Sequence, residues 1–142
     1  SVARNYLSGT IPPEWASTKL EYMSVLVNQL SGPIPKYLGN MTTLLFITLS
    51  FNNLTGSLPV EFNKLTKLTE LRLGGNNFTG KLPSIESLKN LQQLEIQPSG
   101  FEGPVSPSIS VLTGLNELRI SDLTGSASEF PPLENITGLN TL

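Results

Sequence analysis

A hydrophobic pattern recurs along the chain at almost constant spacing, and it constrains the fold more than any other feature of the sequence. The pattern reads LxxLxLxxNxL, as in LEYMSVLVNQL, and it opens at Leu20, Leu44, Leu68, Leu91, Leu115 and Leu139. Successive openings are 24, 24, 23, 24 and 24 residues apart. Self-similarity at this period indicates a solenoid, in which each unit buries its hydrophobic face against its neighbours.

The repeat predicts one domain made of stacked units, covering residues 1–142. A partial unit spans 1–19 and a stub spans 139–142, with five full units between them at 20–43, 44–67, 68–90, 91–114 and 115–138. Solenoids need polar terminal units that shield the ends of the core, and neither end of the sequence resembles such a cap. We therefore expect a fragment whose caps are missing.

Two apolar positions in each unit alternate with their neighbours, which predicts a short strand with one buried face. The residues expected to point inward are Met23/Val25, Ile47/Leu49, Leu71/Leu73, Leu94/Ile96 and Leu118/Ile120. One strand per coil would stack into a parallel sheet on a concave face. The Gly-x-apolar-Pro segment that follows, as in SGPIP, would return the chain on the outer side.

An asparagine follows the strand at the same position in the first four units. Asn5, Asn28, Asn52 and Asn76 are predicted to turn inward and to bond backbone groups that have no strand partner. The same column continues as Ser99 and Leu123. We therefore expect this structural asparagine ladder to weaken toward the C-terminal end.

Composition excludes several classes of function. Charged residues make up 14% of the chain and the net charge is −2, so there is no basic face for nucleic acid. Cysteine and histidine are both absent, which removes disulfides, thiol nucleophiles, Cys/His metal sites and the commonest general base. No apolar run is long enough to cross a membrane. We expect no metal and no cofactor in this chain.

The full phrase LxxLxLxxNxLSGxIP resembles the plant-specific leucine-rich repeat, and NQLSGPIPKYLGN (28–40) matches it almost position for position. The resemblance covers essentially the whole chain. It implies an α/β-type leucine-rich-repeat solenoid of right-handed coils, with a parallel β-sheet on the concave face and irregular or 3-10 segments on the convex side. Most proteins of this type are ectodomains of receptor-like serine/threonine kinases.

A narrower resemblance rests on the irregular segments NYLSGTIPPEWA (5–16), PSGFEGPVSPSI (98–109), ELRISDLTG (117–125) and FPPLENI (130–136). These look like a receptor-kinase subgroup that carries a malectin-like domain, a transmembrane helix and a cytoplasmic kinase. The resemblance implies an extracellular location at the plasma membrane for these residues. It also implies ATP as a cofactor of the parent kinase domain, whose motifs are absent here.

The outward strand positions define the expected ligand-binding surface. Tyr22, Leu26 and Phe46 form an apolar and aromatic patch that we expect to grip a peptide or protein, unless a neighbouring domain covers it. Further along the sheet, Arg72, Glu95 and Arg119 fall in one column.

Two interpretations of this charged column remain open. In one, the arginines receive a carboxylate, sulfate or sugar-acid group of a ligand. In the other, which we favour, the column is a cross-strand Arg-Glu-Arg ion ladder that satisfies itself.

Four N-glycosylation sequons occur, at Asn40, Asn53, Asn77 and Asn135. All four lie outside the predicted strands of the concave sheet, so glycans would leave that face open. Asn53 and Asn77 carry less information than the other two, because the repeat itself places a threonine two residues later.

The leading functional hypothesis is the ligand- or co-receptor-binding portion of a plant leucine-rich-repeat receptor-like kinase. Its partner would be an extracellular peptide, glycan or protein. The alternative is a secreted inhibitor or receptor-like protein without a kinase, which a full-length sequence would distinguish; a structural assembly module ranks last. We expect no enzyme activity, because Glu95 and Glu117, although both carboxylates, lie in different columns of an open sheet.

Overall fold

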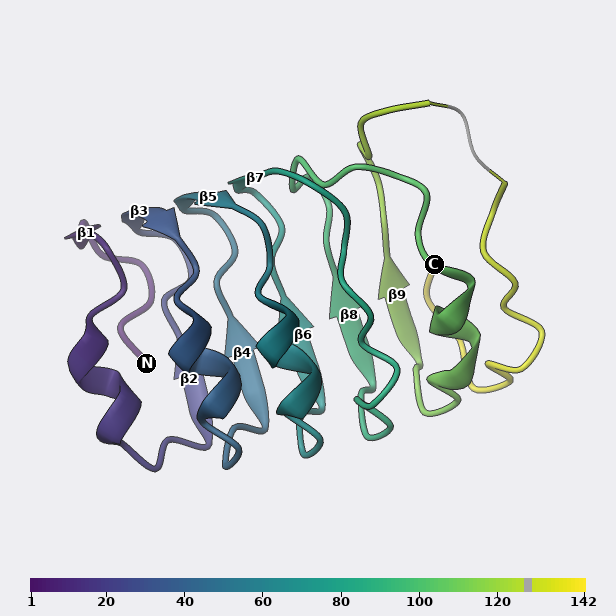
Figure 1. Cartoon of the computed structure of the whole chain (residues 1–142), viewed down its shortest axis with the longest axis horizontal. Helices are drawn as coiled ribbons and strands as arrows, with labels where there is room; N and C mark the ends of the chain where they lie inside the picture. The colour runs from purple at the N-terminus through teal and green to yellow at the C-terminus, as the bar shows by residue number, and fades with distance from the viewer. Residues whose placement is uncertain (127–128) are drawn as a thin grey trace.

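The computed structural model describes residues 1–126 and 129–142. Within these residues the chain winds into coils that stand side by side from the N-terminal to the C-terminal end (Figure 1). Residues 127 and 128 belong to the unit predicted at 115–138 and lie outside the described residues.

The main sheet is a five-stranded parallel sheet in the order β2-β4-β6-β8-β9. Its register pairs equivalent repeat positions, so that Tyr22, Phe46 and Glu70 align across neighbouring strands. The strands are β2 (Tyr22–Ser24), β4 (Phe46–Thr48), β6 (Glu70–Arg72), β8 (Gln93–Glu95) and β9 (Glu117–Arg119). The strand predicted from LxxLxL is therefore confirmed.

The core lies between the main sheet and the opposite face of the coils. The central residue of each main-sheet strand is buried because side chains alternate between the two faces of a strand: Met23, Ile47, Leu71, Leu94 and Leu118. The second inward position is also buried in four coils, while Ile120 in the last is only partly buried. Packing of successive coils thus makes one continuous core.

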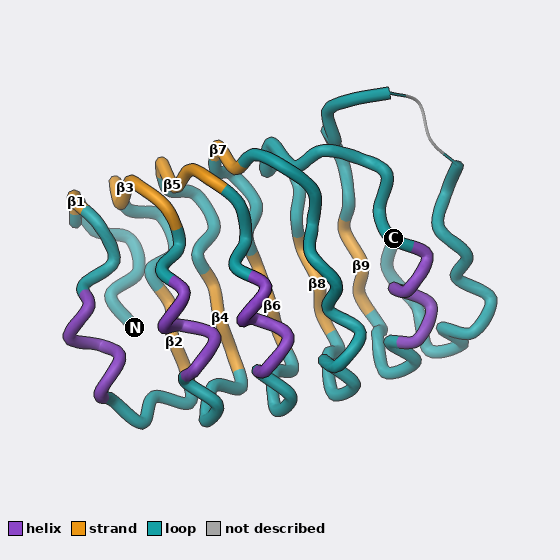
Figure 2. The backbone as a smooth tube through the Cα atoms, in the orientation of Figure 1, coloured by secondary structure: helices purple, strands orange, loops and turns teal. Residues whose placement is uncertain are grey.

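Short 3-10 helices line the opposite face and close the core from that side (Figure 2). They are η1 (Pro13–Ser17), η2 (Lys36–Asn40), η3 (Val60–Lys64) and η4 (Pro107–Val111). The coil that begins at Leu68 has turns here instead, and it is one residue shorter than the others. In this coil the Ser87 N–H donates to Oδ1 of Asn63 at 3.0 Å, so a side chain tethers the turn.

A second sheet, the edge sheet, runs along one edge of the coils and was not predicted. It is parallel, four-stranded and ordered β1-β3-β5-β7. Its strands are β1 (Ser8–Gly9), β3 (Gln29–Pro33), β5 (Asn53–Gly56) and β7 (Asn77–Phe78). The return segment that begins each SGxIP motif is thus a strand in the first coils.

The ladder asparagines lie between the two sheets and bond the backbone of adjacent coils. Asn52 donates from Nδ2 to the carbonyls of Val25 and Leu49 at 3.0 and 2.9 Å, and its Oδ1 accepts the Leu30 N–H at 3.1 Å. Asn28 and Asn76 make the equivalent bonds, each to backbone groups of its own coil and of the coil before it. The amide of Asn5 donates only within its own coil, to Val2 and Ala3.

The next coil replaces this asparagine with Ser99. Its side chain is fully buried, and its Oγ has no hydrogen-bond partner. The Ser99 backbone carbonyl instead accepts the Phe78 N–H at 2.8 Å, the bond that an asparagine Oδ1 accepts in earlier coils. Beside it, the buried rings of Phe78 and Phe101 stack with centroids 5.0 Å apart. Beyond β7 the described residues continue the edge sheet as isolated bridges, Lys81 to Glu102 and Glu102 to Thr124.

Candidate ligand-binding face of the main sheet

The aromatic part of the predicted surface is a stacked pair on the open face of the main sheet. The rings of Tyr22 and Phe46 lie with centroids 5.0 Å apart and planes 24° apart. The register explains the pair, because these residues are direct partners on β2 and β4. Tyr22 is 59% exposed, while Phe46 and Leu26 are partly buried. The structure therefore places the stacked rings of Tyr22 and Phe46 on a face that solvent reaches.

Two further exposed apolar residues were missed from the sequence. Val27 and Phe51 stand immediately before ladder asparagines and are 44% and 54% exposed. Both have a left-handed backbone, with φ of 53° and 56°, which is strained for β-branched and aromatic residues. Gly75 has the same conformation without that strain, at φ 65°, in the next coil. Both residues directly precede a ladder asparagine, and this shared repeat position could have identified them from the sequence.

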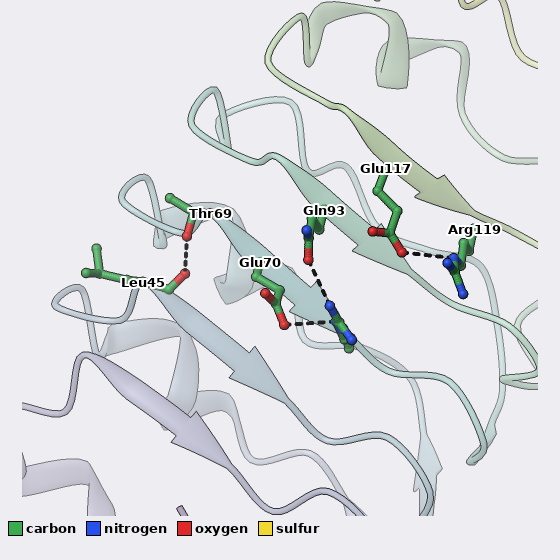
Figure 3. A network of polar contacts seen from close by, with 7 residues as sticks. Leu45, Thr69, Glu70, Gln93, Glu117 and Arg119 are labelled. Atoms are coloured by element: carbon green, nitrogen blue, oxygen red, sulfur yellow. Dashed lines mark hydrogen bonds and ion pairs between the residues drawn. The ribbon is translucent and has the colours of Figure 1, made fainter. Parts of the chain in front are cut away.

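The two arginines of the charged column each form an ion pair within their own strand. Arg72 Nε lies 2.8 Å from Glu70 Oε1, and Arg119 Nε lies 2.9 Å from Glu117 Oε1. Arg72 also donates from Nη2 to Gln93 Oε1 at 2.8 Å. Figure 3 shows Glu70 and Gln93 converging on one guanidinium, and Glu117 reaching Arg119. Each arginine thus has a carboxylate partner two residues earlier on the same face.

The favoured Arg-Glu-Arg ion ladder is wrong in its partners. The column itself exists, because Arg72 pairs in register with Glu95 and Glu95 with Arg119. Among the described residues, however, Glu95 forms no ion pair with either arginine. The ion pairs of both arginines are instead with Glu70 and Glu117 on their own strands.

Two residues at outward repeat positions are buried. Ser50 is 1% exposed and Gly74 is also buried, although both occupy outward repeat positions. A Cβ on Gly74 would overlap the carbonyl oxygen of Gln97, since the QPSG segment of the next coil passes close to it. The contact surface is consequently narrower than alternation alone predicts.

The four sequon asparagines are all exposed and lie away from the main sheet. Asn53 and Asn77 begin β5 and β7 of the edge sheet, and Asn40 ends η2. Asn40 Oδ1 accepts a hydrogen bond from Lys64 Nζ at 3.1 Å. Asn135 lies in a turn near the C-terminal end of the chain.

The open face has features of recognition rather than of chemistry. Glu117 is held by Arg119, and Glu95 stands on the adjacent strand in a different column, so the two carboxylates do not flank one site. Among the described residues no group of three or more Asp, Glu, His or Cys side chains could hold a metal ion. No helix within residues 1–126 and 129–142 has the length and apolarity needed to cross a bilayer.

Comparisons with known proteins identify the fold. A family model described as Leucine Rich Repeat matches residues 43–65 and 67–88. No curated protein matches the chain significantly. Together with the two parallel sheets and the 3-10 segments, the family match and the structural matches below establish that the chain has the leucine-rich-repeat fold, as predicted.

Solved structures of plant receptor ectodomains are similar over most of the chain. The PEPR1–AtPEP1 structure covers 99% of it at 29% identity with a TM-score of 0.89. The ectodomain of the Arabidopsis thaliana membrane receptor kinase GASSHO1/SCHENGEN3, in complex with CASPARIAN STRIP INTEGRITY FACTOR 2, covers 96% at 28% identity with a TM-score of 0.84. The Arabidopsis receptor kinase HAESA, in complex with the peptide hormone IDA and the co-receptor SERK1, covers 84% at 36% identity with a TM-score of 0.80. The chain spans 20% of the length of each.

Proposed function

We propose that this chain is the ligand- or co-receptor-binding part of the extracellular portion of a plant receptor-like kinase. The stacked Tyr22–Phe46 pair on a preformed sheet, with the Tyr22 ring exposed, is the observation that carries the proposal. Aromatic side chains fixed by a rigid scaffold bind at a low ordering cost and dominate the energetics of many interfaces. The similar HAESA structure contains a peptide hormone and a co-receptor, which favours an extracellular peptide or protein as partner of this chain.

Binding by the aromatic pair can be tested with a double variant, Tyr22→Ala/Phe46→Ala. Calorimetry would titrate the complete extracellular portion with peptide fractions from plant extracellular fluid. We expect the wild type to bind and the double variant to lose at least about tenfold in affinity, the scale of one interface hot spot. Tyr6→Ala is the matched control, because Tyr6 is 88% exposed and lies before the edge sheet. Equal binding by the double variant, or no binding by the wild type, contradicts the proposal.

The kinase and the subgroup are finer parts of the same proposal. The irregular segments 98–109 and 130–136 support membership of the receptor-kinase subgroup with a malectin-like domain. The full-length transcript should then encode that domain, one apolar span of about 20 residues and a kinase that uses ATP. A transcript that ends after the repeats would instead favour the secreted inhibitor or receptor-like protein.

As part of the same proposal, N-glycans are attached at Asn40, Asn53, Asn77 and Asn135. Their exposure, and their position away from the open face, support glycans that leave the binding surface free. At Asn40 the bond from Lys64 engages Oδ1, which leaves the amide nitrogen, the atom that carries a glycan, available. Enzymatic deglycosylation of plant-expressed protein should convert each site to aspartate in peptide mapping. A site found as unmodified asparagine contradicts the assignment at that residue.

A further inference from the structure

The charges on the open face of the main sheet do not balance locally. Arg72 and Arg119 each have a carboxylate within 2.9 Å, from Glu70 and Glu117 respectively. These ion pairs are partly screened, since the arginine side chains are 35% and 44% exposed. They nevertheless neutralise both cations of the column. An incoming acidic group would have to compete with a carboxylate already in place.

Glu95 stands between the two arginines in register and takes part in neither pair. Within residues 1–126 and 129–142 no lysine or arginine nitrogen lies within ion-pair distance of its carboxylate. The carboxylate lies over Gly74, with Oε1 3.0 Å from the position that a Cβ on this glycine would take. Because Gly74 has no side chain, nothing on that residue shields the charge. The structure therefore leaves one unpaired anion on the binding face.

The anion and the aromatic pair are held at a defined separation. The register places Glu95 two strands away from Phe46 and two residues further along. With strands about 4.8 Å apart and about 3.3 Å per residue, the two positions are about 12 Å apart. An extended peptide covers that distance in three to four residues.

We propose that the open face of the main sheet binds an extended peptide segment that places a lysine or arginine side chain on Glu95. An apolar side chain of the same segment, three to four residues away, rests on the Tyr22–Phe46 pair. The charge complementarity selects this occupant, since the arginines are already neutralised and Glu95 is not. The inference rests on the proposed peptide-binding function and specifies its ligand class. It is the opposite of the less favoured interpretation of the charged column, in which the arginines receive an anion.

A positional-scanning library of synthetic octapeptides, presented to the complete extracellular portion, tests this inference. We expect peptides retained by the wild type to be enriched in Lys or Arg at a position three or four residues from an apolar side chain. Glu95→Gln should reduce that enrichment about tenfold, the scale of one charge-assisted bond. Glu95→Arg should shift the preference to Asp or Glu. Glu86→Gln is the matched control, because Glu86 is an exposed glutamate in a turn on the opposite face.

The outcomes separate this inference from the function on which it rests. Enrichment of acidic peptides on the wild type, or basic enrichment that survives Glu95→Gln, overturns the inference and leaves peptide binding standing. Retention of no peptide above background overturns the proposed function and the inference with it. An unchanged thermal midpoint in Glu95→Gln shows that a lost preference is not a loss of folding.

Discussion

The coils before residue 68 and those after residue 90 build the same solenoid with different bonds. In the earlier coils Asn28 and Asn52 bond two coils at once through their side-chain amides. In the later ones Ser99 substitutes a backbone carbonyl for one of these bonds, and Leu123 occupies the next ladder position. The edge sheet also ends at β7, before the later coils begin. A regular second sheet thus accompanies the amide ladder, while the hydrophobic core continues without it.

The largest expected effect is the loss of a ladder asparagine from the earlier coils. Asn52→Ala would leave the Leu30 N–H without its partner in a part-buried site, and it would remove one of the two amide donors from each of the Val25 and Leu49 carbonyls. We expect a loss of about 3 kcal/mol in the free energy of unfolding, measured by urea titration. Asn90→Ala removes one exposed bond, from Nδ2 to the Thr66 carbonyl, and should cost less than about 1 kcal/mol. Equal losses in the two variants would show that the ladder has no special role.

Two glycine-to-alanine substitutions, one in each region, test how tightly the coils pack. A Cβ on Gly39 would overlap the backbone of Glu61, where η2 packs against η3. Gly39→Ala should therefore cost about 1–3 kcal/mol, the scale of overpacking. In the last coil, Gly138→Ala would place its Cβ no nearer than 3.7 Å to the Leu115 carbonyl oxygen and should change the thermal midpoint little. A larger loss at Gly138 than at Gly39 would reverse the comparison.

Tyr37 tethers η2 to the preceding coil and makes the free energy of unfolding of the early coils depend on pH. Its hydroxyl donates to the Pro12 carbonyl at 2.5 Å, and burial, then the nearby Glu14 charge, raises its pKa above the ordinary 10.0. The folded state favours the neutral phenol, so this contribution is complete below pH 10 and is lost as pH rises through the raised pKa.

Tyr37→Phe should cost about 1 kcal/mol at neutral pH and should flatten the alkaline fall in stability. Urea titrations of wild type and variant between pH 8 and pH 11 measure both effects. A variant that loses stability at alkaline pH as steeply as the wild type would assign the effect to another group. Tyr6→Phe is the control, because Tyr6 is 88% exposed.

The smallest expected effect is in the later coils, at Ser99. Its buried Oγ has no hydrogen-bond partner, and the bond to Phe78 comes from the backbone carbonyl. Ser99→Ala should therefore change the free energy of unfolding by less than about 0.5 kcal/mol, because no side-chain bond is broken. A loss approaching that of Asn52→Ala would mean that the hydroxyl bonds a group which the structure leaves unpaired.

The sequence predicts the main sheet well because side chains determine it. Leucines such as Leu71 and Leu94 alternate with polar neighbours, and that alternation fixes which face is buried. The edge sheet was missed because its β3 strand, ending in Ser31, Gly32 and Pro33, has neither alternation nor β-branched residues. Its pairing is a property of the backbone, which leaves no side-chain signature.

The sequence predicts which residues lie on the candidate site better than it predicts which side chains contact each other there. The Tyr22–Phe46 pair follows directly from the repeat register. The partners of the arginines could not be derived, since Arg72 has a carboxylate within reach both across the sheet and along its own strand. Rotamers decide between such neighbours at similar distances, and the choice of Glu70 left Glu95 unpaired.

Amide hydrogen exchange tests most directly the claim that asparagine side chains hold the earlier coils more tightly. The Leu30 and Leu54 amides donate to Oδ1 of Asn52 and Asn76, whereas the Gly103 and Thr124 amides donate to backbone carbonyls beyond the ladder. The account predicts that the first two amides exchange at least about tenfold more slowly than the second two. Equal protection, or faster exchange at Leu30 and Leu54, would contradict it.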